Sequence, residues 1–338
     1  DFVVALLATL KAGGGYLPIP IGMPDAAIAD ILSVSNPVAV ATTASQAGRL
    51  PEAWRTLDRC TILERGWQDR LSYADQKALS LAPRPRGGNL AFSVMSSGTT
   101  GQPKGILCPH RGAVNSYWWR YHHLAYGDDE REACNVFFVW EVLRPMLQGR
   151  PAYVIADDII FDPPRLIEFL ERHRITRVLF TPSLLDQVLK DSCQDFADRL
   201  ANLRVVICNG EVVTTALAER FNKRLPHVSL VNDYSISECH DVATVELRTS
   251  SLQSASRYLP VGRPMSNVNV YILDSEQQPV PVGTPGEVYV GGDGLALGYL
   301  SNTSETALGF LDDPFARPCS GRGPARMFRT GDTGRLLP

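Results

Sequence analysis

Residues 96 to 105 read Ser-Ser-Gly-Thr-Thr-Gly-Gln-Pro-Lys-Gly, a combination of residue types suited to binding phosphate. Its three glycines let the backbone approach a ligand closely, and successive N–H groups in such a loop can form a nest for an anion. Four hydroxyl groups and Lys104 add donors for phosphate oxygens. A P-loop is excluded because Pro103 stands where that motif needs a glycine before the lysine. The segment indicates a phosphate-binding loop of another kind, with a flexible surface loop as the alternative.

The other reactive side chains give weaker signals. Cys239 and His240 are adjacent, and neighbouring side chains seldom face each other, which argues against a Cys–His catalytic pair. His122 and His123 have no carboxylates at the spacing that a metal site needs, so these two imidazoles are expected to be packed or solvated. The tryptophans at 118 and 119 are predicted to lie in the core rather than to stack on nucleic acid.

Composition bounds the function class. The chain has 338 residues, 44% of them hydrophobic, and a formal net charge of −3, so no basic excess points to nucleic acid. No segment reaches the ~20 continuous apolar residues of a membrane span. Seven cysteines are scattered without a C-x-x-C pair, which predicts reduced thiols and a cytoplasmic protein. The length predicts two or three compact units.

Helix and strand patterns alternate along most of the chain, which predicts an α/β fold with mostly parallel sheets. From about residue 256 short strands follow one another without long helices, which predicts a β-rich unit. The loop at 96–105 directly follows one of the expected strands. Helices are expected at 1–10, 26–34, 164–172, 182–190 and 215–225, and strands at 16–20, 38–42, 90–95, 152–155, 177–180, 203–208, 228–232, 268–273 and 286–290.

The loop at 96–105 resembles the phosphate loop of adenylate-forming enzymes, specifically the adenylation domains of nonribosomal peptide synthetases and related synthetase-like carboxylate-activating enzymes. Five further segments match motifs of that family in order, and together they span nearly the whole chain. They are residues 10–19 (LKAGGGYLPI), 139–141 (VWE), 232–238 (NDYSISE), 286–292 (GEVYVGG) with 298–300 (GYL), and 328–332 (FRTGD).

The resemblance implies a fold of two α/β subdomains, at 1–95 (incomplete at its N-terminus) and 96–255, followed by a β-rich, barrel-like subdomain at 256–338. It also implies that these residues are the large N-terminal core, without the family's C-terminal subdomain and its catalytic lysine. Adenylation by these 338 residues alone is therefore expected to be impaired.

Site roles follow from the matching positions. The resemblance implies that Thr99, Thr100 and Lys104 contact ATP phosphates, that Tyr234 stacks on adenine, and that Glu238 holds Mg²⁺. Ser237 would bind phosphate and Asp332 the ribose hydroxyls, although a helix cap and a turn are the plain alternatives for these two. The remaining nucleotide-binding positions are Ser96, Ser97, Gly98, Gly101, Asn209, Gly210 and Asp233.

The acid-binding positions implied by the resemblance are Val136, Phe137, Trp140, Leu179, Ile207, Asn209, Asp233, Asp241 and Val242. Val136 stands where the family motif F-D-x-S-V-W-E has the aspartate that binds an α-amino group, so an ordinary α-amino acid is not expected. The aromatic side chains and the two acids suggest a cage for a displaced cation, as in glycine betaine or β-alanine. The alternative is an apolar site for an aryl or keto acid, with the acids turned toward backbone N–H groups.

The implied reaction is ATP- and Mg²⁺-dependent formation of an acyl-adenylate, followed by transfer to the phosphopantetheine thiol of a carrier domain. The expected partners are a small carboxylic acid, the carrier domain, the C-terminal subdomain and a terminal reductase domain, with no nucleic acid and no membrane. Two alternatives stay open: a free-standing acyl-CoA synthetase, and a nucleotide-binding module that does not catalyse.

Overall fold

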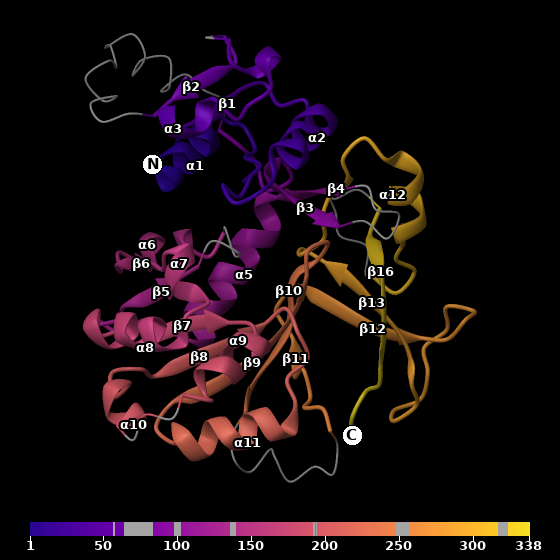
Figure 1. The fold of residues 1–338 in the computed structure, drawn as a ribbon. Helices are drawn as coiled ribbons and strands as arrows, with labels where there is room; N and C mark the ends of the chain where they lie inside the picture. Colours follow the sequence, from indigo (N-terminus) through magenta and orange to yellow (C-terminus); the bar gives the residue numbers. More distant parts are fainter. Residues whose placement is uncertain are drawn as a thin grey trace. The chain divides into compact units, whose positions relative to one another are not determined.

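The computed structural model describes residues 1–56, 58–63, 84–97, 103–135, 140–191, 193, 195–247, 257–316 and 324–338. They form two compact units: residues 1–112 with 295–312, and residues 113–294 with 313–338 (Figure 1). The mixed α/β architecture with several sheets confirms the fold class predicted from the alternating pattern. The expected subdomain boundaries at 95 and 255 stay predictions.

The first unit has two small sheets. Strands β1 and β2 pair in parallel, and β3 pairs antiparallel with β4, which pairs antiparallel with β14. A small core gathers Ile28, Leu32, Leu50 and Trp54. The elements are α1 (Phe2–Lys11), α2 (Asp25–Ser35), β1 (Val40–Thr42), α3 (Ala44–Ala47), the 3₁₀ helix η1 (Glu52–Trp54), β2 (Cys60–Ile62), β3 (Leu90–Ser97), β4 (Pro103–Pro109), β14 (Gly298–Tyr299), α12 (Thr303–Gly309) and β15 (Phe310–Asp312).

One expected strand of this unit is wrong. Residues 16–20 form no strand, and only Tyr16 makes an isolated bridge, to Phe92. Pro18 and Pro20 have no N–H group to donate to a ladder, so the segment does not continue the pairing.

The second unit is built on a seven-stranded sheet in the order β11-β10-β9-β8-β7-β5-β6. Strands β6, β5, β7, β8 and β9 are parallel, and β10 and β11 add on antiparallel. The strands are β5 (Glu132–Cys134), β6 (Ala152–Val154), β7 (Arg177–Phe180), β8 (Val205–Asn209), β9 (Ser229–Ile236), β10 (His240–Leu247) and β11 (Arg263–Pro264). The helices are α5 (His110–His123, of which the part from residue 113 belongs to this unit), α6 (Leu143–Leu147), α7 (Asp157–Ile160), α8 (Pro163–Arg172), α9 (Pro182–Val188), α10 (Phe196–Arg199) and α11 (Thr215–Arg224).

Helices α8, α9 and α11 cover one face of this sheet and form the main core with it (Figure 1). Each begins at a side-chain cap: Asp162, Thr181 and Thr214 accept from the backbone N–H three residues on, at 3.3, 3.3 and 3.2 Å. Their apolar spacing and these caps explain why the sequence located them to within two residues at each end.

The opposite face of the sheet packs against the C-terminal end of α5. Because strand side chains alternate, Leu179, Ile207 and Val231 point to this face, and Leu124, just after α5, packs against them. Arg120 and Ser116 lie one and two turns before Leu124, respectively, on the same stripe and are buried. This orientation turns Trp118 outward, so its predicted place in the core is wrong: it is 60% exposed and lies against His122.

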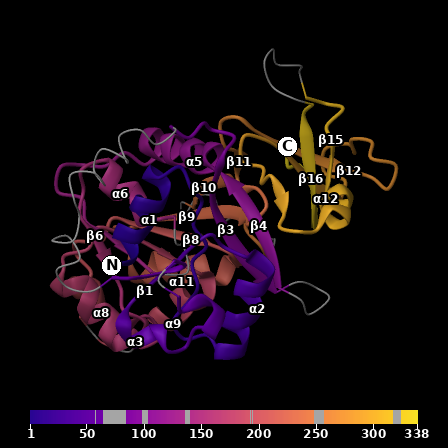
Figure 2. The ribbon, with the colours of Figure 1, turned by 90° about the horizontal axis from the view of Figure 1, so that it is seen from above.

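A second sheet of this unit contains β12 (Val268–Leu273), β13 (Gly286–Gly292) and β16 (Arg326–Gly334), paired antiparallel in that order (Figure 2). It accounts for the β-rich pattern expected after residue 256. The C-terminal part of β16 carries Asp332.

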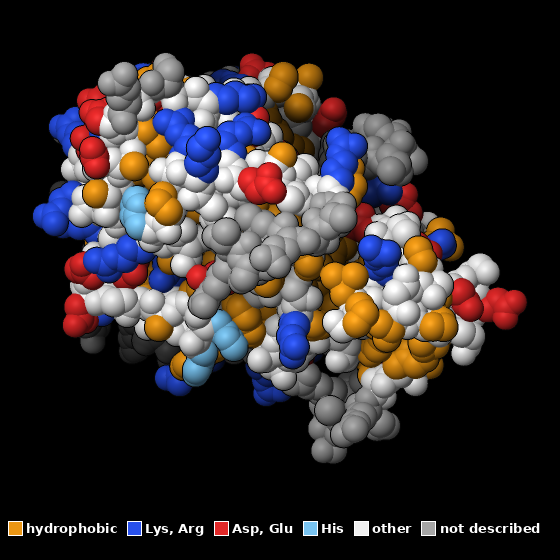
Figure 3. All heavy atoms as spheres, turned by 90° about the horizontal axis from the view of Figure 1, so that it is seen from below, with side chains coloured by type: hydrophobic (Ala, Val, Ile, Leu, Met, Phe, Trp, Pro, Cys, Tyr) orange, Lys and Arg blue, Asp and Glu red, His pale blue; other side chains and the backbone are white. Residues whose placement is uncertain are grey.

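The molecular surface carries both signs of charge. On the face drawn in Figure 3, Lys and Arg side chains are interspersed with Asp and Glu. Across the described ranges, no helix is both long and apolar enough to cross a membrane.

Candidate functional site

The hairpin of β9 and β10 positions six of the candidate residues that lie in the second unit. Asp233 and Tyr234 are consecutive on β9, so their side chains leave opposite faces of the strand. Asp233 reaches toward α5, and Tyr234 reaches toward β16. The hairpin therefore presents candidate side chains on both faces of β9, Asp233 on the face toward α5 and Tyr234 on the face toward β16.

Tyr234 and Asp332 meet although 98 residues separate them in the chain. The Tyr234 hydroxyl donates to Asp332 Oδ2 at 2.6 Å. The Asp332 backbone N–H donates to Thr330 Oγ1 at 3.0 Å, and Gly331 takes a φ of +78° that permits the turn. Burial raises the pKa of the Tyr234 hydroxyl, and Asp332 raises it further. An aromatic face beside an exposed carboxylate suits an adenine ring and ribose hydroxyls.

The tight turn between the two strands holds Ser237 and Glu238. Ser237 is exposed and Glu238 half-buried. The turn is packed closely, because a Cβ at Gly294 would lie 2.3 Å from the Cys239 carbonyl oxygen. Within the described ranges, no group of three or more His, Cys, Asp or Glu side chains is arranged to hold a metal. A single accessible carboxylate fits Mg²⁺, which keeps water ligands and is commonly held by one or two carboxylates together with substrate phosphates.

Asn209 is the last residue of β8 and pairs with Asp233 of β9. The Asn209 amide donates to Asp233 Oδ2 at 2.8 Å, and the Ser235 hydroxyl donates to Asn209 Oδ1 at 2.7 Å. Gly210 follows with a φ of +87°. These bonds fix the Asp233 carboxylate at the carboxyl end of the parallel strands, where open α/β sheets bind ligands.

The predicted acid-binding residues of the sheet share one face. Leu179, Ile207, Asn209 and Asp233 all point toward α5, as period-two alternation requires. Val242 is fully buried on β10, and Trp140 packs edge-on against His240 with ring centroids 5.8 Å apart. The structure thus places the four sheet residues on one face, while Val136 and Phe137 lie outside the described residues.

Arg120 of α5 is a residue of this region that the sequence motifs did not indicate. Its Nη2 contacts Asp233 Oδ2 and lies 3.0 Å from Asp241 Oδ2. Ser116 donates to the same Asp241 oxygen. All three charged side chains are almost completely buried. The only sequence signal was the four-residue spacing of Ser116, Arg120 and Leu124, which puts them on one stripe of the helix.

A second buried guanidinium, that of Arg144 on α6, lies between Glu132 and Glu141. Tyr126 donates to Glu132 and accepts from the Arg144 Nε at 3.1 Å. Two guanidinium groups therefore face four carboxylates, an arrangement that leaves negative charge in excess if every group is ionised.

Burial and charge together set the protonation of this cluster. Burial and the charge of Asp241 hold the pKa of Asp233 well above its ordinary value. Burial also raises the pKa of Glu141, although Arg144 opposes the shift. For Asp241, burial acts upward, but Arg120 and the Ser116 hydrogen bond outweigh it and lower the pKa. The excess acids are thus the ones that hold protons most readily.

In the first unit, Ser96 and Ser97 lie on β3 and Lys104 lies on β4. The Lys104 Nζ lies 2.5 Å from Glu305 Oε2 and 5.8 Å from the centroid of the Tyr299 ring. Gly105, the next residue, is confined by Leu300, because an added Cβ would lie 2.9 Å from the Leu300 Cβ. Residues 98–102, which include Gly98, Thr99, Thr100 and Gly101, lie outside the described residues.

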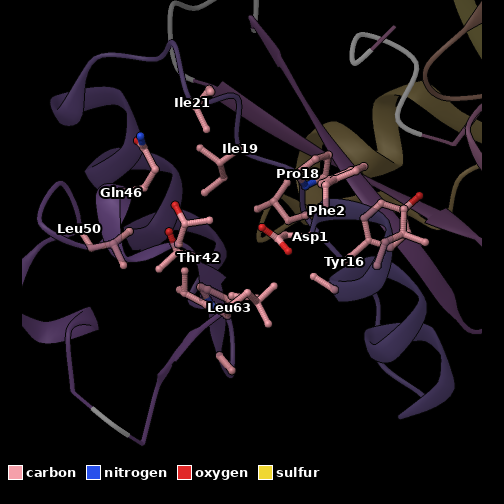
Figure 4. A pocket seen from close by; sticks show the side chains of 18 of the residues that line it. Asp1, Phe2, Tyr16, Pro18, Ile19, Ile21, Thr42, Gln46, Leu50 and Leu63 are labelled. Carbon is pink, nitrogen blue, oxygen red and sulfur yellow. The ribbon is translucent and has the colours of Figure 1, made fainter. Parts of the chain in front are cut away.

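The first unit also contains a pocket of about 360 Å³ (Figure 4). Its wall is largely apolar, with Phe2, Ile19 and Leu50 among the lining residues together with the acidic Asp1. None of its lining residues belongs to the candidate set, so this pocket is distinct from the predicted site.

Comparison with known proteins places these features in context. The sequence profile described as AMP-binding enzyme matches residues 1–300. The chain is 38% identical over 340 residues to a protein named glycine betaine reductase ATRR from Emericella nidulans, covering 100% of this chain and 26% of that protein. The chain therefore spans about a quarter of the length of this relative.

Peptide synthetases are similar over the same region. The chain is 34% identical over 342 residues to phosphinothricin tripeptide synthetase PhsB of Streptomyces viridochromogenes, covering 99% of this chain and 27% of that protein. It is 31% identical over 343 residues to tyrocidine synthase 3 of Brevibacillus parabrevis, covering 100% of this chain and 5% of that protein. The crystal structure of the nonribosomal peptide synthetase FmoA3 superposes with a TM-score of 0.81 at 24% identity, over 98% of this chain and 34% of that one, which shows the same fold.

Proposed function

This chain belongs to the AMP-binding enzyme family, and on that premise we propose that it supplies the nucleotide and acid sites with which a larger enzyme activates a carboxylic acid. It is a member of the adenylate-forming superfamily with the fold of a nonribosomal peptide synthetase. The single observation that carries the proposal is the hydrogen bond between Tyr234 and Asp332 on β9 and β16. It joins two motif residues with the chemistry to bind adenine and ribose.

The proposed reaction joins the substrate carboxylate to AMP. A carboxylate oxygen attacks the α-phosphorus of ATP and forms a new P–O bond. The bond between the α-phosphorus and the oxygen that bridges it to the β-phosphate breaks, and pyrophosphate leaves with that electron pair. Such transfers depend on alignment and on neutralising charge rather than on covalent help from the protein. Lys104, with Thr99 and Thr100, is proposed to bind the phosphates, and Ser237 to donate a further hydrogen bond.

Tyr234 and Asp332 orient the nucleotide in this scheme, and the pairing of their side chains holds both in place before ATP arrives. Glu238 would hold Mg²⁺, which when bound supplies positive charge to the phosphates. Asn209, Gly210 and Asp233 shape the carboxyl ends of the strands beside the nucleotide.

For the acid, we favour a cationic carboxylate such as glycine betaine, with β-alanine as the second choice. The relative named glycine betaine reductase supports this choice, as does Val136 at the position of the family aspartate. Trp140 offers an aromatic face suited to a cation, and Asp241 is a buried acid whose pKa is lowered by Arg120 and by the Ser116 hydrogen bond. An aryl or keto acid remains the competing substrate class.

The proposed acceptor of the acyl group is the phosphopantetheine thiol of a carrier domain, and a reductase domain would then release the product. The relatives named as synthetases and as a reductase support these partners. Free coenzyme A as the acceptor is the alternative, as is a module that binds nucleotide without catalysis.

The test is ATP–pyrophosphate exchange by the full-length protein with glycine betaine, β-alanine, glycine, pyruvate and benzoate. We expect the two cationic, non-α-amino acids to give the fastest exchange. Faster exchange with pyruvate or benzoate would contradict the substrate proposal. ATP binding without exchange for any acid of a broad panel would favour the non-catalytic module.

A second measurement separates the acceptors. Incubation with ATP and the preferred acid should load a thioester onto the phosphopantetheinylated carrier domain, detected by intact-protein mass spectrometry. The carrier without phosphopantetheine is the matched control. Faster turnover with free coenzyme A than with the carrier would contradict the proposed acceptor.

A further inference from the structure

The two carboxylates proposed to face the substrate cation are already engaged by the chain itself. Asp233 Oδ2 accepts from Arg120 and from Asn209, the latter at 2.8 Å. Asp241 Oδ2 accepts from Ser116 and from Arg120, the latter at 3.0 Å. One guanidinium nitrogen thus bridges one oxygen of each acid.

The outer oxygen of Asp233, Oδ1, is buried and finds no hydrogen-bond partner among the described residues. A single open oxygen is a poor match for a primary ammonium, which has three N–H donors to satisfy. Buried donors without acceptors weaken binding.

A quaternary ammonium has no N–H donor and needs no acceptor. It is held by aromatic faces and by negative potential spread over its methyl groups. Arg120 bridges Asp233 and Asp241, so both carboxylates are engaged by the chain, and the aromatic face of Trp140 is the group left to hold a cation. This arrangement favours a quaternary ammonium, which needs no hydrogen-bond acceptor, over a primary ammonium.

We infer that Arg120 is a positioning residue that sets substrate selectivity: by bridging Asp233 and Asp241 it withholds both carboxylates from a primary ammonium and favours a quaternary one. The inference rests on the proposed function, since it assigns the discrimination within that same acid site. Arg120 acts through the two acids and belongs to none of the sequence motifs of the chain.

The experiment compares glycine betaine with β-alanine in pyrophosphate exchange by the full-length wild type and by Arg120→Met. Freeing the carboxylates should lower the betaine-to-β-alanine ratio of kcat/KM by about tenfold or more, mainly through KM. Arg120→Lys keeps the positive charge and should restore most of the wild-type ratio. A ratio within twofold of wild type in an Arg120→Met protein that still turns over would overturn the inference.

Controls separate selectivity from folding. Arg177→Met removes another buried guanidinium of the same sheet, one that bonds the carbonyl oxygens of Leu124 and Ala125, and should leave the ratio unchanged. ATP affinity, measured by calorimetry, reports whether each variant keeps its nucleotide region.

If Arg120→Met does not fold, Asp241→Asn is the variant that tests the inference. It keeps Arg120 and removes one negative charge, so betaine KM should rise several-fold while pyruvate KM stays within twofold. Equal changes for both acids would overturn the inference. A wild type that activates neither cationic acid refutes the proposed function and this inference together, whereas an unchanged ratio refutes this inference alone.

Discussion

Replacing His240 by Asn should remove a large part of the acid sensitivity of the fold. His240 begins β10, is 5% exposed, and lies edge-on to Trp140. Burial lowers its pKa from 6.5 to about 4, although the charge of Asp241 opposes the shift. Its φ of +58° is a left-handed conformation that Asn tolerates better than most residues, so the substitution keeps the backbone geometry.

The sign and size follow from proton linkage. The folded state keeps the imidazole neutral, while the unfolded chain takes up a proton below pH 6.5. The stability that this difference represents is fully present above pH 6.5 and is lost as the pH falls toward about 4. At pH 4.5 the loss is about 2.5 kcal/mol relative to pH 8.

The assay is urea unfolding of the wild type and His240→Asn at pH 8, 6.5, 5.5 and 4.5. Asp233 and Glu141 have raised pKa values, so their protonation stabilises the folded state as the pH falls and partly masks the imidazole in either protein alone. Subtracting the two curves cancels that contribution. The reasoning is refuted if the difference in unfolding free energy stays constant from pH 8 to 4.5.

Three further substitutions test other features. Phe221→Ala removes a completely buried ring of α11 and should cost about 3–5 kcal/mol of unfolding free energy, read from denaturant midpoints. Gly262→Ala would place a Cβ 2.1 Å from a carbonyl oxygen of β10 at a φ of +90°, whereas Gly283→Ala would place one in open space at a φ of +87°. The melting temperature should therefore fall much further for Gly262→Ala than for Gly283→Ala. Equal falls would show that backbone strain alone matters. Glu305→Gln frees Lys104 from its ion pair and should raise ATP affinity about two- to fivefold by calorimetry; weaker binding would mean that Glu305 positions the lysine for phosphate.

Local patterns were sufficient for part of the second unit, whereas α5, β5 and β10 were not expected from the sequence. The helices α8, α9 and α11 combine apolar spacing with a capping residue, and both signals depend only on neighbours in the chain. The parallel strands β7, β8 and β9 are short apolar runs between those helices, which is typical of a buried sheet. Residues 16–20 failed because a strand also needs N–H donors, which Pro18 and Pro20 lack.

The sequence also determined the set of candidate residues, since motif order requires no three-dimensional information. It placed Tyr234, Glu238 and Asp332 in one nucleotide site, and the hydrogen bond between Tyr234 and Asp332 is consistent with that expectation. The roles of these residues, and of the loop at 98–102, stay predictions.

The tertiary structure alone decided what the acids of the site contact. Arg120 lies 113 and 121 residues from the two carboxylates that it bridges, and no local spacing relates a residue of α5 to residues of β9 and β10. Helix periodicity and strand alternation each limit the faces available to a side chain, but only the packing of α5 on the sheet brings these faces together. The same packing turned Trp118 outward and buried Arg120. Because a buried charge must find opposite charge or give up its own, that packing also set which acids hold protons.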